Sequence, residues 1–232
     1  MSETHAKLEW DGAGTRRYHT GVKFGVLYPK DSNGAYPKGV AWNGLTQVAG
    51  NPDGAEATDL WADNIKYASF RSAETFGGSI NAYTWPEEWY ACDGYAHPTG
   101  LEGMNLGQQP RMPFGLCYRT EVGDDITPAE AVNGNYILHL VYGATASPSS
   151  KEHGTINNNP DAVEFSWDFE TTPVSVGTAL SNGKPTSYIE LDSRVLGATK
   201  MAAIENVLYG STTADARLPL PQEVASILSS AT

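Results

Sequence analysis

The segment from Val163 to Glu170 places the strongest constraint on how this chain of 232 residues folds. Apolar side chains stand at positions 163, 165, 167 and 169, and polar or acidic side chains alternate with them. Successive side chains of a β-strand point to opposite faces of a sheet. The segment is therefore expected to be a strand with one face on a hydrophobic core and the other in water.

Other strand patterns occur on both sides of this segment. A central strand is expected from Tyr136 onward, because the side chains there are apolar on both faces. The dipeptide Gly77–Gly78 is expected to form the turn of a hairpin. Further strand patterns occur at residues 22–28, 113–123 and 187–193.

Helical patterns lie mostly at the end of the chain. Met201, Ile204 and Leu208 have helical spacing, and helical segments are expected over about residues 197–229. A short helix is expected after Pro86, which suits a first helical position. About seven to nine strands followed by helices predict a mainly β chain, namely a two-sheet β-sandwich or barrel with a flanking α-helix.

The chain is expected to contain one domain and an appendage. Residues 1–19 lack periodicity and predict an N-terminal arm that becomes ordered on binding, whereas residues 20–232 predict a single domain. The N-terminus has no apolar signal-peptide stretch, and no later run approaches the roughly 20 apolar residues that span a bilayer. We therefore expect synthesis and retention in a cytoplasm, with no membrane partner.

The segment from Gly39 to Asn64 combines turn-forming residues with large apolar side chains. Its glycines, asparagines and Pro52 predict a long inter-strand loop, which extends over about residues 29–64. A loop of this kind is usually exposed, yet it carries apolar side chains that water disfavours. Large exposed apolar clusters usually mark interaction sites. The side chains concerned include Trp42, Leu45, Leu60 and Trp61.

The net charge restricts the partners of the chain. A formal charge of −12 and an isoelectric point near 4.7 argue against stable nucleic-acid binding, because neutralising phosphates requires clustered Lys and Arg. An acidic surface repels phosphate, which is the property that a channel for passing DNA requires.

Motifs for catalysis, cofactors and metals are absent from the sequence. Cys92 and Cys117 are too far apart for a CxxC pair and are expected to be buried thiols. The adjacent Glu87 and Glu88 suit a helix N-terminus and cannot face one bond as an acid and nucleophile pair. His139 lies in a strand that is apolar on both faces and is expected to be a hydrogen-bonded core or interface histidine. No catalytic, cofactor-binding or metal-binding residue is therefore assigned, and no enzyme is predicted.

The aromatic content leaves an alternative function open. Six tryptophans and twelve tyrosines are compatible with a sugar-stacking platform, as in a carbohydrate- or receptor-binding β-sandwich module of a phage or bacterial surface. Core and interface packing is the favoured explanation, because several tryptophans lie beside turn residues and not on one strand face.

A series of segments resembles a known family in wording and order. They include TGVKFGVLYP, KGVAWNGLTQV, ATDLWADNIKYASFRSAETFGGSINAYTWPEEW, GQQPRMPFGLCYRTEVGDD, YILHLVYGATASPS and ENVLYGSTTADARLPLPQEV. Together they resemble the major tail protein, or tail tube protein, of long-tailed siphophages. The resemblance extends from about Thr20 to Val224.

The resemblance implies a structural virion protein whose copies form hexameric rings with a continuous inner β-barrel. The rings stack head to tail into the tail tube, through which DNA passes into the host without specific binding. The implied partners are further copies of the chain, the tape-measure protein, the distal tail protein and the tail terminator. In the family a long early loop reaches a neighbouring subunit. The resemblance therefore implies that Trp42, Leu45, Leu60 and Trp61 form a self-assembly interface and become buried only on assembly.

Overall fold

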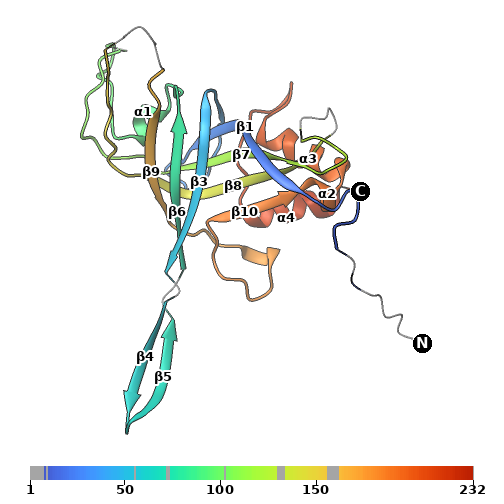
Figure 1. Cartoon of the computed structure of the whole chain (residues 1–232). Coiled ribbons are helices and arrows are strands. Elements are labelled where there is room, and N and C mark those ends of the chain that lie inside the picture. Colours follow the sequence, from blue (N-terminus) through green and yellow to red (C-terminus); the bar gives the residue numbers. More distant parts are fainter. Residues whose placement is uncertain are drawn as a thin grey trace.

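The computed structural model describes residues 8, 10–54, 56–71, 74–101, 103–129, 134–155 and 162–231. The chain is mainly β, as predicted, with one large antiparallel sheet and few helices (Figure 1). The strands of this sheet follow the order β2-β1-β7-β8-β9-β6-β3, and β10 pairs with β8. The path from β2 to β3 is not closed into a barrel. The bounds are β1 (Tyr18–Pro29), β2 (Val40–Trp42), β3 (Leu45–Gly54), β6 (Glu74–Ala82), β7 (Phe114–Gly123), β8 (Asn135–Ala146), β9 (Phe165–Thr171) and β10 (Tyr188–Asp192).

Two further strands form a separate hairpin, and the helices are short. The hairpin consists of β4 (Ala57–Ala62) and β5 (Ile65–Arg71). Three of the helices lie together on one side of the sheet, whereas α1 lies among the loops at another end (Figure 1). The helices are α1 (Trp89–Cys92), the 3₁₀ turn η1 (Gly177–Ala179), α2 (Ser193–Leu196), α3 (Ala198–Leu208) and α4 (Pro221–Ser230).

Strand β8 divides the sheet at Gly143. One edge of β8 pairs with β7, whereas the other edge pairs with β10 over residues 137–141 and with β9 over residues 144–146. Gly143 lies between these partners with φ of 62°, a left-handed conformation that glycine adopts without steric cost. A Cβ at this position would lie 2.2 Å from the carbonyl oxygen of Thr172. Glycine therefore allows β9 to diverge from β10 along the same strand.

Apolar side chains fill both faces of the central strands. On one face Trp42, Trp89 and Trp167 meet, with ring centroids 4.7 to 5.9 Å apart. On the other face, side chains of β1, β7 and β8 pack against α3 and α4. The apolar run from Tyr136 therefore forms a central strand buried on both faces, as predicted.

Several sequence expectations are confirmed by the structure. In β9, Trp167 and Phe169 are buried while Ser166, Asp168 and Glu170 are exposed. The predicted alternation of buried and solvent-exposed residues is thus confirmed, although the strand begins only at Phe165. In α3 the buried residues are Met201, Ile204 and Leu208, as their spacing predicts.

The hairpin expected at Gly77–Gly78 is wrong, because both residues lie inside β6. Their lack of a side chain serves close packing of the neighbouring strands. A Cβ at Gly78 would lie 2.0 Å from the carbonyl oxygen of Ala49, and one at Gly77 would lie 2.9 Å from that of Phe169. Glycine in a strand interior often marks such a close approach.

The long loop expected over residues 29–64 is also wrong, because β2, β3 and β4 occupy much of it. Strand β3 pairs with β6 from Leu45↔Ala82 to Gly54↔Glu74. Pro52 is tolerated because β3 is the last strand of the sheet, where the missing N–H breaks no further ladder. The expected N-terminal arm overlaps β1, which starts at Tyr18; residues 1–7 and 9 lie outside the described part.

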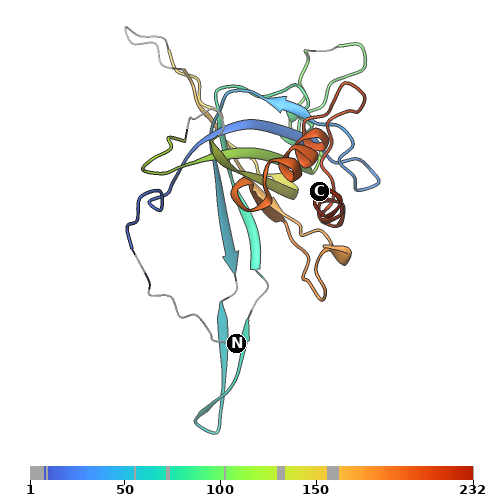
Figure 2. The same ribbon diagram turned by 90° about the vertical axis from the view of Figure 1, so that its right-hand side faces the viewer.

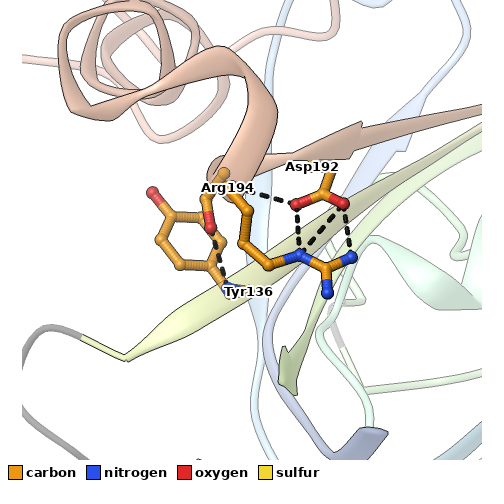
Figure 3. Close-up of polar contacts among 4 residues, drawn as sticks. Tyr136, Asp192 and Arg194 are labelled. Atoms are coloured by element: carbon orange, nitrogen blue, oxygen red, sulfur yellow. Dashed lines mark hydrogen bonds and ion pairs between the residues drawn. The ribbon is translucent and has the colours of Figure 1, made fainter. Parts of the chain in front are cut away.

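A polar junction attaches the first C-terminal helix to the sheet (Figure 3). The carboxylate of Asp192 accepts a hydrogen bond of 2.9 Å from the backbone N–H of Arg194 and thereby caps α2. The guanidinium of Arg194 also pairs with this carboxylate, which lowers the pKa of Asp192. The hydroxyl of Ser193 accepts a hydrogen bond of 2.9 Å from the backbone N–H of Tyr136 in β8. These contacts join β8, β10 and α2.

Candidate assembly surface

The β4–β5 hairpin projects away from the body of the molecule, beyond the ends of β3 and β6 (Figures 1 and 2). Every residue of β4 is exposed, and so is every residue of β5 except Ala68. An isolated two-stranded hairpin is marginally stable in water. Because the residues on both faces of the hairpin are exposed, a partner can pack on either face.

The tip of the hairpin is a two-residue turn at Asp63 and Asn64. Their φ angles are 50° and 63°, which lie in the left-handed region. Asp and Asn adopt this region more readily than other residues with side chains, and two-residue turns of this kind match the twist of the flanking strands. The turn thus fixes the adjacent pairs Ala62↔Ile65 and Trp61↔Lys66, and a register shift follows between Trp61 and Leu60.

One face of the hairpin carries no charge. Cross-strand partners lie on the same face, and the pairs Thr58↔Phe70, Leu60↔Ala68 and Ala62↔Ile65 place six uncharged residues together. Leu60 is 46% exposed and Phe70 is 62% exposed. We call this surface the uncharged face; it consists of Thr58, Leu60, Ala62, Ile65, Ala68 and Phe70.

The opposite face of the hairpin is mixed. It carries two exposed aromatic side chains, Trp61 and Tyr67, which are 68% and 72% exposed. Asp59 and Lys66 form an ion pair of 2.7 Å there, and hydrogen bonds from Lys66 and Ser69 lower the pKa of Asp59. Such an exposed pair contributes little stability. We call this surface the charged face.

The structure separates the four residues that the sequence assigns to self-assembly. Trp42 lacks the exposure this role requires: it is 3% exposed within a single chain, and its Nε1 donates a hydrogen bond of 2.8 Å to the carbonyl oxygen of Thr84. The expectation that Trp42 becomes buried only on assembly is therefore wrong. Its pairing with Gly25 in β1 places it against the core tryptophans.

Leu45 is also partly covered by its own chain. It packs against the core cluster that contains Trp42, and a Cβ at Gly25 would lie 2.2 Å from Leu45 Cδ1. Leu60 and Trp61 are exposed, but they lie on opposite faces of the hairpin. Only these two of the four residues are freely exposed in the single chain.

Sequence reasoning did not identify the other exposed apolar residues of the hairpin, namely Ile65, Tyr67 and Phe70. The Asp63–Asn64 dipeptide was the signal that a hairpin turn lies there, between two segments of β-forming residues. The long loop expected over residues 29–64 includes this dipeptide.

A cleft of about 490 Å³ opens near the start of β3. Phe24, which is 58% exposed, forms part of its wall and adopts φ of 53°. A positive φ is strained for a bulky residue, and such strain concentrates at functional sites. The Phe24 ring lies 6.1 Å from that of Tyr209. The lining is uncharged throughout: Phe24, Gly25, Val26, Gly39, Ala41, Trp42, Asn43, Tyr209 and Ala216.

A second polar cluster surrounds His139 and links three strands. The hydroxyl of Tyr188 donates a hydrogen bond of 2.8 Å to Glu190, so it accepts one from Nδ1–H of His139. Nε2 of His139 then accepts a hydrogen bond of 2.7 Å from the hydroxyl of Thr120. Burial lowers the pKa of His139 to about 4, although the charge of Glu190 acts in the opposite direction. His139 is therefore a neutral, hydrogen-bonded histidine of the protein interior, as the sequence predicts.

The remaining candidate groups are structural. Cys92 and Cys117 are buried free thiols, as expected, and burial raises the pKa of each to about 12. Within the described ranges, no three His, Cys, Asp or Glu side chains are grouped so as to hold a metal ion. No helix in the described part of the chain has the length and apolar character needed to cross a membrane.

No protein-family model matches the sequence, and no match was found among curated proteins.

Proposed function

We propose that the chain is the structural protein of a phage tail tube. Copies assemble into hexameric rings, and the rings stack head to tail into a conduit for DNA delivery into the host. The observation that carries this proposal is the isolated β4–β5 hairpin, whose Leu60 and Trp61 stand exposed on a two-stranded ribbon away from the body. The resemblance of the sequence to siphophage tail tube proteins supports it independently.

The open edges of the sheet support the formation of rings. The strand path ends in β3 on one side and in β2 on the other, and β2 covers only residues 25–27 of β1. Exposed strand edges are templates for pairing with another chain. Pairing of unlike edges is a heterologous contact, which closes into a ring when the rotation between copies allows it. In this proposal, each chain is a two-sheet β-sandwich or barrel, and six copies join in that way into a continuous inner barrel.

The charge of the chain suits a conduit. Six copies at −12 carry about 72 formal negative charges per ring, and acidic groups that face the bore repel DNA. DNA then passes through without binding. The proposed protein partners are further copies, the tape-measure protein, the distal tail protein and the tail terminator, and the proposed location is the virion tail.

The competing function, a carbohydrate- or receptor-binding module, has less support. Trp42, Trp89 and Trp167 pack together in the core and are not available to stack on a sugar. Trp61 and Tyr67 on the charged face are the exposed aromatics that such a module would use. Glycan-array binding that is lost in Trp61→Ala, with assembly unchanged, would favour this alternative.

Electron microscopy of the purified full-length chain over a range of concentrations tests the proposal. We expect rings or tubes to form as the concentration rises. Monomers at every concentration, together with normal tails after deletion of the gene, would contradict it.

A further inference from the structure

The cleft beside Phe24 and the β4–β5 hairpin lie at opposite ends of the same strand. Asn43, which lines the cleft, is two residues before the start of β3, and the hairpin follows the end of β3. Ten residues of β-strand span about 30 Å at roughly 3.3 Å per residue. The hairpin also points away from the body (Figure 2). The hairpin of one copy is therefore placed to reach another copy and not its own cleft.

The two surfaces match in chemistry. The cleft lining and the uncharged face of the hairpin contain no charged side chain. Two copies at −12 repel each other, so a contact between copies is most favourable where neither surface adds charge. The cleft volume of about 490 Å³ lies within the range of protein binding pockets.

The Phe24 side chain is held in a fixed position in the wall of the cleft. Its ring is exposed although its backbone is held at φ of 53°, where a phenylalanine is strained. The guanidinium of Arg119 lies 5.4 Å from the Phe24 ring and 3.7 Å from the Tyr136 ring, so it supports Phe24 from the side. An exposed aromatic ring fixed in this manner suits an anchor in a contact, because little side-chain freedom is lost on binding.

We propose that the uncharged face of the hairpin, centred on Leu60, Ile65 and Phe70, docks into the Phe24 cleft of the next copy. The inference rests on the proposed function, since it assigns the contact between successive copies in a head-to-tail assembly. A contact between two different surfaces of the same chain repeats without closing and produces a filament. The charged face, with Trp61 and Tyr67, lies outside this contact.

Cross-linking between copies tests the docking directly. The full-length double variant Asn43→Cys/Ile65→Cys places one thiol at the rim of the cleft and one on the uncharged face. The native Cys92 and Cys117 are buried and do not compete. Oxidation of assembled tubes is expected to give a ladder of disulfide-linked multimers on a non-reducing gel. The matched pair Asn43→Cys/Lys66→Cys, with its second thiol on the charged face, is expected to give no ladder.

The outcomes separate the docking from the proposed function. Tubes of the double variant without a ladder, or an equal ladder from the control pair, would overturn the docking and leave the tail-tube proposal intact. Failure of the unaltered chain to form rings or tubes would instead contradict the proposed function.

A double-mutant cycle covers the case in which the cysteine variant does not assemble. Phe24→Ala and Phe70→Ala are each expected to raise the concentration at which tubes form by at least tenfold. The double variant is expected to show little more than the larger single effect, because both changes remove the same contact. Tyr67→Ala, an equally exposed aromatic on the charged face, is the control and is expected to show no coupling to Phe24→Ala. Independent, multiplying effects of Phe24→Ala and Phe70→Ala would overturn the docking.

Discussion

The backbone N–H of Thr172 donates a hydrogen bond of 2.9 Å to the carbonyl oxygen of Gly143, where β8 changes its partner from β10 to β9. The N–H of Gly143 in turn donates a hydrogen bond of 2.8 Å to the hydroxyl of Tyr36. This close approach depends on the absence of a side chain at position 143. The division of the sheet is therefore determined at one residue.

The variant Gly143→Ala is expected to lower the free energy of unfolding by about 3 kcal/mol, since it combines a left-handed backbone with overpacking. Urea unfolding of the purified chain measures this change. Gly154→Ala is the control, because no atom lies within 4 Å of a Cβ built there. Equal stability of the two variants would show that β8 accommodates a side chain at position 143, where it changes its partner strand.

Two tryptophans are expected to respond in opposite ways. Trp42→Ala removes a buried ring from the core and is expected to cost about 3–5 kcal/mol of unfolding free energy. Trp61→Ala removes an exposed ring and is expected to change the stability of the monomer by less than about 0.5 kcal/mol. Thermal or urea unfolding of the unassembled chain distinguishes the two. A large loss of stability in Trp61→Ala would place that ring against its own chain.

The same Trp61→Ala variant also tests whether the charged face of the hairpin makes a second contact in the assembly, apart from the docking of the uncharged face. Truncating an interface anchor costs about 2 kcal/mol or more for each contact, and the loss is repeated in every copy of a ring. We expect tube formation to require a higher protein concentration, measured by sedimentation or electron microscopy. Unchanged tube formation would remove Trp61 from the interface.

His139 makes the stability depend on pH in a defined window. The pKa of His139 in the folded chain is about 4, below its ordinary value of 6.5, so the unfolded chain binds more protons between these values. The contribution of His139 to stability is therefore full above about pH 6.5 and falls as the pH decreases toward 4. We expect a loss of about 3 kcal/mol over this window, at about 1.4 kcal/mol for each unit of difference in pKa.

Urea unfolding at a series of pH values, with His139→Gln as the comparison, isolates this effect from the titration of carboxylates. The variant is expected to have the flatter pH dependence of the two. Parallel curves would show that His139 titrates alike in the folded and unfolded chains.

Ionic strength should control assembly. Copies at −12 repel each other, and salt shortens the range of this repulsion to about 8 Å at physiological ionic strength. Tubes are therefore expected to form at a lower protein concentration in 0.15 M salt than in 0.01 M salt, as light scattering can measure. Assembly that weakens with salt would instead indicate that attraction between charges holds the copies together.

Local side-chain patterns account for much of the fold. The alternation around Trp167 and the helical spacing of Met201, Ile204 and Leu208 are consequences of burying one face, so they can be read from the sequence. The sequence suggests a turn at Gly78, whereas this glycine allows close packing between strands. That role cannot be read from the sequence, because the neighbouring strand is distant in sequence.

The candidate assembly surface could likewise be predicted only in part from the sequence. Leu60 and Trp61 could be identified because large apolar residues beside turn signals are unusual. The burial of Trp42 could not, since it depends on Trp89 and Trp167, which come from segments far along the chain. The division of the hairpin into two faces depends on the Asp63–Asn64 turn and on the register shift between Leu60 and Trp61, which together set the pairing of β4 with β5.

Strand β3 also has a mechanical consequence. It is hydrogen-bonded to β6 from Leu45↔Ala82 to Gly54↔Glu74, and the hairpin projects beyond this ladder. A pull on the hairpin acts along the strands, whereas the hydrogen bonds of an antiparallel pair run perpendicular to them. Because the hairpin joins the end of β3 to the start of β6, both strands are pulled together, and the load falls in shear on the ladder between β6 and β9, from Gly77↔Glu170 to Ala82↔Phe165. The bonds of that ladder share the force, so that rupture requires many of them to break together. A tube held by such hairpins resists stretching far better than it would if each contact could be peeled apart one bond at a time.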